Sequence, residues 1–385
     1  MGQKGSSASA ASKGYVGEAS SVGFTGSIKR FSCHFFAQVY KEAATDQNVF
    51  VSPYSVCTCL SMVSTGAANK TLQEMLSVLA EEGKDGGGMK TLQSRAKQFR
   101  ALQESLGSLE DVRVDVANAV VSHNSLKGGP EFPTFQKILS EDFQALFLNG
   151  GGATGMQTAV DQFVNTKTNG KIPELPLQLT ELDRLVLLNC VYFKGVFESE
   201  FDASKTKQDG TFKGFKGKVP SKLMNKNDRM WYAENETFQA VVLPYKGHPK
   251  GQPPPMKGGM GEIYLLIALP KETGEKGLSD TVKSLVSGAM DTLELGKPEV
   301  HLVLPSFKLE WDGSLNECLK NMGIVQAFDS NAADFSTISG GADALFLSKV
   351  KHKTVVELNE KGTEAAAATA AVVRLRVCVY EYVCA

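Results

Sequence analysis

The sequence has few of the features that mark secreted, membrane-spanning or nucleic-acid-binding proteins. It has no apolar run long enough to cross a bilayer, and residues 1–23 are rich in Gly, Ser and Ala without the apolar stretch of a signal peptide. The formal net charge is -1, so no overall field favours nucleic acid or an anionic membrane. Seven thinly spread cysteines, an odd number, favour reduced thiols in a cytosolic protein over a disulfide framework.

The motifs of a catalytic or metal centre are also missing. The five histidines form no H-E-x-x-H pair, and the chain contains no G-x-S-x-G elbow and no Walker loop. Cys57 and Cys59 have no second Cys or His pair nearby, which favours buried structural thiols over a zinc site. We therefore expect no enzyme activity, no metal and no cofactor, and only a triad assembled from distant residues stays open.

One stretch, Gly150 to Gly155, formally matches the dinucleotide-binding pattern G-x-G-x-x-G. That function requires a strand before the glycines and a βαβ unit around them. The residues before the glycines, about 132–147, have a helical pattern, and no βαβ unit is visible. We therefore interpret residues 150–155 as a flexible linker.

The N-terminus offers two interpretations. Residues 1–6 fit the N-myristoylation pattern with Gly2 as the acceptor. A flexible tail of small residues, which residues 1–25 resemble in composition, would match the same pattern by chance. A single acyl chain at Gly2 would give only reversible membrane binding, so we expect membrane association only if Gly2 is acylated.

The rest of the chain interleaves helices and strands without a regular βαβ order. Ser52 and Pro53 open a helix that should run to about Thr65. The strand expected at 184–193 is apolar throughout, which predicts burial on both faces. Further strands are expected at 239–243, 263–269, 300–304 and 306–310. The pattern predicts one large α+β unit with several sheets.

A series of short motifs runs along the chain in a characteristic order. Asn48 to Val56 opens a helix, Leu187 to Gly195 is an apolar strand, and Glu360 to Ala370 is a run of small residues. Weaker matches include Val116 to Asn118, Phe163 to Ile172, Leu243 to Tyr245, Leu304 to Phe307 and Ala333 to Ser336. Together, over about residues 26–376, they resemble the serpin family of serine protease inhibitors.

The resemblance implies an α+β fold with three β-sheets, eight to nine helices and an exposed reactive-centre loop at about residues 360–380. It implies a single domain over residues 26–385. The composition predicts a flexible tail over residues 1–25, and the cysteines and the missing signal peptide predict a cytosolic protein, which we expect to be a monomer. A serine protease would cleave the loop as a substrate. The hinge side of the loop would then insert into the central sheet and carry the acyl-enzyme with it.

The hinge is the stretch whose composition agrees best with insertion. Its residues are Glu360, Gly362, Thr363, Glu364, Ala365, Ala366, Ala367, Ala368 and Thr369. None is aromatic, large and apolar, or a proline, and by strand alternation Thr363, Ala365, Ala367 and Thr369 face one side. The alanines alone would also suit a helix, but Gly362 before them and Val372 and Val373 after them disfavour a long one.

The family's loop spacing places Arg376 before the scissile bond and Val377 after it. Arg374 is the alternative if the register is shifted by two residues. An Arg at this position suits a protease whose specificity pocket contains a carboxylate, as in trypsin-like enzymes. We therefore expect a trypsin-like, Arg-specific serine protease as the partner.

Four polar residues lie in or beside apolar runs: Ser52, Ser55, Asn189 and His352. If buried, they must hydrogen-bond to one another or to the backbone. The resemblance implies a network behind the central sheet, at the place where it opens. Without the resemblance they would be interpreted as helix caps and satisfied core residues.

The sequence departs from the family's pattern in two respects. Phe163 and Phe197 occupy positions where the family usually has Trp. After Arg376 only nine residues remain, so we expect the usual C-terminal strands to be missing and sheet edges to be unpaired. The alternative function is therefore a non-inhibitory serpin-fold protein that acts as a binding or chaperone-like module.

Overall fold

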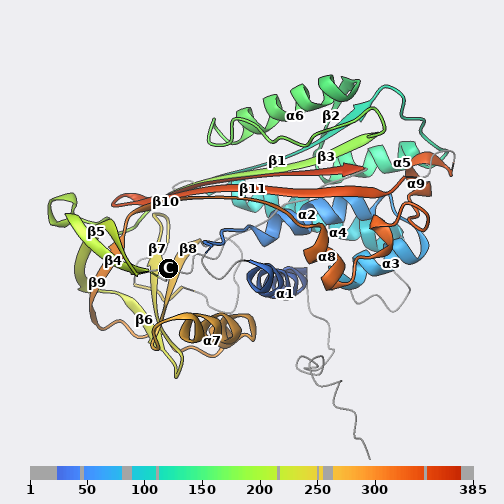
Figure 1. Cartoon of the computed structure of the whole chain (residues 1–385). Helices are drawn as coiled ribbons and strands as arrows, with labels where there is room; N and C mark the ends of the chain where they lie inside the picture. The colour runs from blue at the N-terminus through green and yellow to red at the C-terminus, as the bar shows by residue number, and fades with distance from the viewer. Residues whose placement is uncertain are drawn as a thin grey trace, which may run out of the picture.

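The computed structural model describes residues 24–43, 47–79, 89–109, 112–214, 217–248, 251–254, 263–341 and 345–373. The expected tail, 1–25, lies outside these residues except for Phe24 and Thr25, which begin the first helix. A large central sheet divides the molecule, with one long helix on one face and most of the other helices on the opposite face (Figure 1). No helix in the described part of the chain combines the length and apolar character needed to cross a membrane.

The central sheet has six strands, and strands distant in sequence are neighbours in it. Their order is β10 (Phe307–Ser314), β11 (Leu347–Asn359), β12 (Gly362–Val373), β3 (Leu185–Val196), β1 (Val112–His123) and β2 (Leu146–Gly151). All neighbouring pairs are antiparallel except β1 and β2. The apolar strand predicted at 184–193 is β3, and nine of its twelve residues, from Leu185 to Phe193, are buried in succession.

Helices cover both faces of this sheet. On one face lies α6 (Ala153–Lys167), which crosses above the strands (Figure 1). On the other face lie α1 (Phe24–Glu42), α2 (Pro53–Ser64), α3 (Asn69–Val78), α4 (Met89–Gly107), α5 (Phe132–Lys137), α8 (Asn316–Met322) and the short α9 (Ser336–Ser339). The strands between them are therefore buried from both sides.

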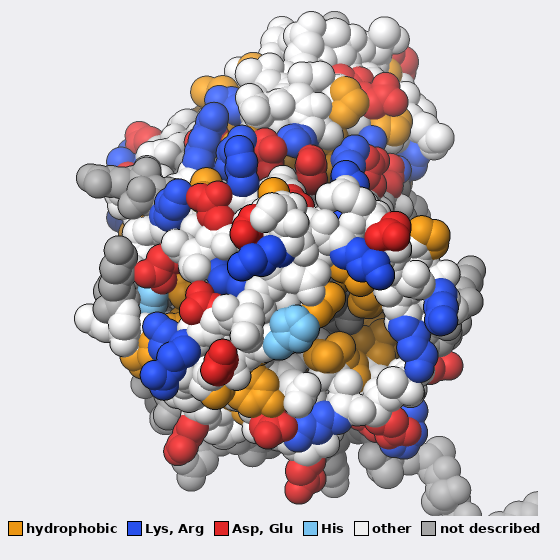
Figure 2. Space-filling view, turned by 90° about the vertical axis from the view of Figure 1, so that its left-hand side faces the viewer, with side chains coloured by type: hydrophobic (Ala, Val, Ile, Leu, Met, Phe, Trp, Pro, Cys, Tyr) orange, Lys and Arg blue, Asp and Glu red, His pale blue; other side chains and the backbone are white. Residues whose placement is uncertain are grey.

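Two smaller sheets lie at one end of the molecule. One contains β4 (Lys207–Gly214), β5 (Gly217–Arg229) and β9 (Glu299–Pro305), and the other contains β6 (Trp231–Glu234), β7 (Phe238–Pro244) and β8 (Tyr264–Pro270), against which α7 (Glu275–Val286) packs. Basic and acidic side chains are interspersed on the face seen from this end, and apolar side chains gather in a hollow there (Figure 2). The predicted α+β class with three sheets is confirmed.

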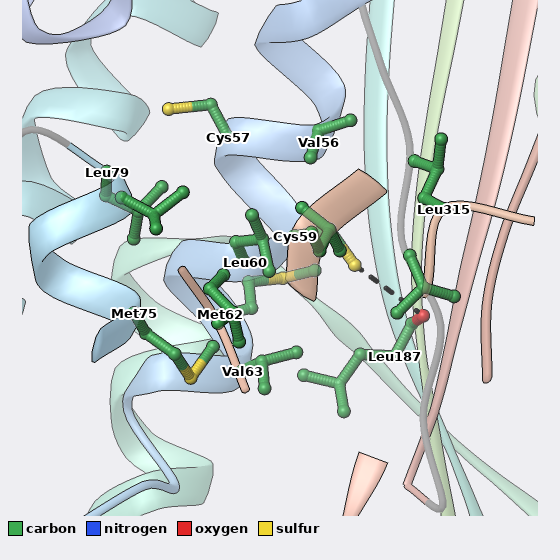
Figure 3. Packing of buried hydrophobic residues seen from close by; sticks show 14 of the residues in the cluster. Val56, Cys57, Cys59, Leu60, Met62, Val63, Met75, Leu79, Leu187 and Leu315 are labelled. Atoms are coloured by element: carbon green, nitrogen blue, oxygen red, sulfur yellow. Dashed lines mark hydrogen bonds between the residues drawn. The ribbon is translucent and has the colours of Figure 1, made fainter. Parts of the chain in front are cut away.

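The core behind the central sheet is organised around α2, all of whose residues are buried. The helix begins at Pro53, directly after Ser52, as the sequence predicted. Its apolar side chains meet Met75 and Leu79 on one side and Leu187 of β3 on the other, where the Cys59 thiol donates to the Leu187 carbonyl (Figure 3). Three of its buried hydroxyls, those of Thr58, Ser61 and Ser64, donate to carbonyls of the preceding turn, which offsets the cost of burying them.

The interpretation of residues 150–155 as a flexible linker is wrong. The predicted helix ends early, a π-helical turn (Ile138–Asp142) follows, and β2 then pairs in parallel with β1 before α6 begins. The glycines permit close packing, since a Cβ on Gly155 would lie 2.0 Å from the Gly150 carbonyl oxygen. A local pattern could not reveal β2, because the strand forms only by pairing with β1.

The carboxylate of Glu181 lies at the start of α6. The backbone N–H of Ala153 donates to the Glu181 carboxylate at 2.9 Å, and His123 Nε2 lies 2.9 Å from the other oxygen of that carboxylate. These two contacts hold the pKa of Glu181 below its usual value. The glycines therefore lead into a helix N-terminus that already has a carboxylate from its own chain.

We expect the α2 core to be sensitive to truncation. Leu60 is completely buried, so Leu60→Ala should lower the free energy of unfolding by about 2–5 kcal/mol through lost transfer energy and a cavity. Leu182 is 62% exposed, and Leu182→Ala should change it by less than about 0.5 kcal/mol. Urea unfolding followed by tryptophan fluorescence measures both, and equal effects would contradict this description of the core.

Candidate functional site

The hinge stretch is a strand in the middle of the central sheet. The sequence led us to expect an exposed loop at about 360–380, whereas residues 362–373 form β12, paired along its length with β11 on one edge and β3 on the other. The backbone continues directly from β11 into β12 through a turn at Glu360 and Lys361. Insertion satisfies the backbone hydrogen-bonding groups of β12 on both edges, which an exposed loop leaves to water.

The small side chains of β12 alternate between two apolar clusters. Ala366, Ala368, Ala370 and Val372 lie in the cluster beneath α6, whereas Ala365 lies in the cluster on the opposite face. The alternation expected from the sequence is therefore found for these residues. Because Ile172, Leu175 and Leu177, from the segment after α6, belong to the same cluster, larger side chains in the first group would collide with this packed layer.

The start of the hinge is held by its neighbours. The Phe201 and Phe197 N–H groups donate to the carbonyls of Glu360 and Lys361 at 2.9 and 2.8 Å. A Cβ on Gly362 would lie 2.0 Å from the Gly195 carbonyl oxygen, so only glycine fits this close approach. The side chains are also bonded, since Thr206 Oγ1 donates to the Glu360 carboxylate at 2.9 Å and the Tyr245 hydroxyl to Thr363 Oγ1 at 2.7 Å.

The four polar residues expected to form a network are all buried. Asn189 donates to Asn118 Oδ1 at 2.8 Å, and Asn118 donates to the Phe143 carbonyl at 2.6 Å. Within the described residues, the hydroxyls of Ser52 and Ser55 make no hydrogen bond.

The strand β12 separates two of these four residues. His352 of β11 and Asn189 of β3 are each paired in register with Thr369, so the inserted strand lies between them. If β12 were absent and the two strands met, His352 and Asn189 would be neighbours. The role of the four residues at the opening of the sheet stays a prediction.

His352 is completely buried, with its ring 5.0 Å from that of Trp311. Burial lowers the pKa of His352 well below its usual range, against a smaller opposing effect of a hydrogen bond with the Ala368 backbone. The ring is therefore neutral at physiological pH. In this structure the ring packs against Trp311 of β10.

Sequence reasoning missed a set of side chains that surround Glu364. The Tyr192 hydroxyl donates to Glu364 at 2.6 Å, Lys171 Nζ lies 3.0 Å from the same carboxylate, and Lys194 Nζ lies 3.9 Å from it. No local pattern identifies these residues, because they come from separate elements that meet only when β12 is in the sheet.

Some predicted sites lie outside the described residues. These are Gly2 and the candidate reactive-bond residues Arg374, Arg376 and Val377. Five described cysteines are free thiols, and the described residues contain no group of three or more His, Cys, Asp or Glu arranged to hold a metal ion.

Comparisons with known proteins agree with this fold. The model of the family described as Serpin (serine protease inhibitor) matches residues 26–382. Iripin-5 of Ixodes ricinus is 33% identical over 87% of this chain and 81% of its own length, and leukocyte elastase inhibitor A of Mus musculus is 31% identical over 86% and 85%. The solved structure of cleaved Serpin 42Da is 25% identical, with a TM-score of 0.77 over 93% of this chain and 90% of that chain. The chain therefore belongs to the serpin family.

The neutral His352 predicts a pH dependence of stability. An unfolded chain protonates this residue below pH 6.5, whereas the folded protein, with its lowered pKa, does not. The contribution of His352 to the free energy of unfolding is therefore fully present above pH 6.5. It is lost as the pH falls, by up to about 1.4 kcal/mol per pH unit. Urea unfolding at several pH values measures this slope.

His352→Gln should flatten the slope below pH 6.5, although it will also lower the stability itself. The matched control is the exposed His301, for which His301→Gln should keep the slope of the parent protein. A His352→Gln variant with an unchanged slope would show that another group is responsible.

Proposed function

We propose that the protein is a suicide inhibitor of a trypsin-like serine protease, which it traps as an acyl-enzyme when the cleaved loop inserts into the central sheet. The observation that carries this proposal is β12: residues 362–373 fit between β11 and β3 with partners on both edges and small side chains on both faces. Of the relatives, leukocyte elastase inhibitor A is by its name an inhibitor of a protease.

The chemistry needs no catalytic group of the inhibitor. The protease's serine oxygen would attack the carbonyl carbon of Arg376, the Arg376–Val377 peptide bond would break, and Val377 would leave with a new amino group. The ester between the serine and Arg376 then holds the protease on the hinge side of the cut. The chain acts as substrate and not as enzyme.

Insertion would then move the protease. A strand of the length of β12 spans about 40 Å, from Gly362 at one end of the sheet to Val373 at the other. In the sequence, Arg376 is three positions after Val373. Insertion would therefore carry the ester-linked protease from the Gly362 end to the opposite end of the sheet, where it would be pressed against the inhibitor.

The remaining parts of the proposal follow the chain's composition. We place the protein in the cytosol as a monomer that binds no nucleic acid and no cofactor, with membrane association only if Gly2 is acylated. Support comes from the five free thiols in the described part of the chain, four of which are buried, and from the near-zero net charge, with both signs interspersed on the face in Figure 2.

One observation favours the second candidate, a non-inhibitory binding or chaperone-like protein. In the structure residues 362–373 already lie in the sheet as β12, and an inserted segment offers no bait to a protease. Thermal unfolding before and after cleavage of the loop distinguishes the two functions. A large gain in stability on cleavage supports the inhibitor, and little or no gain supports the alternative.

The inhibitor should form a complex with trypsin that survives SDS. Arg376→Ala should slow complex formation by about 10- to 100-fold, since it removes a charge-assisted contact with the protease pocket. Arg374→Ala is the matched control and should have little effect. Denaturing gels and the inhibition rate measure both variants; cleavage after Arg376 without a stable complex would leave only a substrate.

A buried, unpaired charge at Thr363 should convert the inhibitor into a substrate. Thr363 is 3% exposed and bonded to the Tyr245 hydroxyl, so Thr363→Arg would have to bury an unpaired guanidinium during insertion. Thr363→Ser keeps the hydroxyl and should still inhibit. The number of inhibitor molecules consumed per protease trapped should rise strongly for the Arg variant, and an unchanged value would contradict the insertion mechanism.

A further inference from the structure

A row of charged side chains crosses the central sheet near its Gly362 end. Glu357 of β11 lies directly opposite Glu364 of β12, Glu364 lies opposite Lys194 of β3, and Lys194 lies opposite Arg113 of β1. Directly opposite residues share a face of a sheet. Ala366, two positions after Glu364, lies in the cluster beneath α6, so this row is on the α6 face.

Insertion of β12 creates an unfavourable pair in this row. Two carboxylates directly opposite one another repel and destabilise the pairing of their strands. Glu357 belongs to β11, which is in the sheet in any case, whereas Glu364 arrives with the inserted strand. The repulsion therefore exists only while β12 is in the sheet, and something must offset it.

The Lys171 side chain lies between the two carboxylates. Its Nζ is 3.2 Å from a Glu357 oxygen and 3.0 Å from a Glu364 oxygen, and the side chain is 24% exposed. Burial would lower the pKa of Lys171, but its hydrogen bonds to Glu364 and Glu357 outweigh burial and raise it. Lys171 is thus a cation held on both carboxylates, an arrangement that we call the Lys171 bridge (Lys171, Glu357 and Glu364).

The turn after α6 holds the bridge in place. The chain leaves the helix through Asn169 and Gly170, whose φ angles of 53° and 75° are left-handed, and the Gly170 N–H donates to the Asn165 carbonyl at 2.9 Å. Directly after Lys171, the buried Ile172 is anchored by its N–H, which donates to Thr168 Oγ1 at 3.1 Å. Lys171 is therefore fixed over the sheet between two anchored neighbours.

The surroundings of Glu364 keep it ionised. Burial would raise the pKa of Glu364, but hydrogen bonds from Tyr192 and Lys171 outweigh it and hold this pKa below its usual value. Burial and the hydrogen bond to Glu364 raise the pKa of Tyr192 to about 12, so its hydroxyl stays a donor. Both carboxylates of the bridge therefore face a cation that neutralises their repulsion.

We infer that Lys171 is a positioning residue for the inserted strand, because it bridges the two carboxylates that insertion of β12 brings together. The bridge holds the first residues of β12, next to Gly362, in the sheet. It therefore sets how often that end of the strand opens. This inference rests on insertion itself. Only its consequence for trapping a protease rests on the proposed function.

Hydrogen exchange measured by mass spectrometry on the full chain, with β12 inserted, tests the bridge. Lys171→Met should speed exchange of the amides at the 362–366 end of β12 by about three- to tenfold, because the local opening of that end becomes easier. Peptides from β7 should be unchanged. The matched control is Lys283→Met, which removes an exposed lysine paired with Asp280 on α7, away from the central sheet, and should leave β12 unaffected.

A rescue variant separates the bridge from a general packing effect. On the Lys171→Met background, Glu357→Gln should restore much of the protection, because it removes the repulsion that the lysine neutralised. On a Glu364→Gln background, Lys171→Met should hardly change the exchange at 362–366. Glu364→Gln leaves the turn after α6 intact, so it can also be tested alone if Lys171→Met folds poorly. The inference is overturned if exchange at 362–366 is the same with and without Lys171, or if Glu357→Gln fails to rescue.

The outcome is independent of the inhibitory function. If the exchange data follow the expectation while no SDS-stable complex forms with trypsin, the bridge stands and the proposed inhibition fails. If complexes form but exchange at 362–366 does not depend on Lys171, the inhibitory function is supported and the proposed role of the Lys171 bridge is rejected.

Discussion

The pairing of β12 with both β11 and β3 is the interaction on which the rest of the structure depends. A strand in the interior of a sheet satisfies its backbone groups on both edges, and its side chains must fit whatever covers the two faces. Here α6 covers one face and the α2 core lies behind the other (Figure 1). That double burial accounts for the alanines, for the glycine at the close approach to Gly195, and for the absence of large apolar side chains between Thr363 and Ala370.

Buried polar groups in and behind the sheet lower the stability of the fold. Asn118 and Asn189 bond to one another deep in the core, while the hydroxyls of Ser52 and Ser55 make no hydrogen bond within the described residues. Each unsatisfied buried group costs about 1–3 kcal/mol. In this structure β12 has backbone partners on both edges, while two buried hydroxyls behind the sheet have none within the described residues.

Contacts with the strands of the central sheet lie at both ends of helix α6. Glu181 caps its first turn and contacts His123 of β1. The Lys171 bridge lies just beyond its last turn and contacts β11 and β12. The strand β12 therefore contacts the turn after the helix, through Lys171 and Glu364.

The amino-acid sequence by itself determined the features that depend on local spacing. These include the start of α2 at Pro53, the burial of β3 along an apolar run, the alternating faces of the hinge and, through the order of its motifs, the family. Only the tertiary structure decided which residues meet. It showed that Gly150 to Gly155 joins a paired strand to a helix, that the hinge lies inside the sheet, and that Lys171 meets Glu357, 186 positions away. The physical reason is that spacing in a sequence fixes the face on which a side chain lies, whereas strand order and register fix its partners across the sheet.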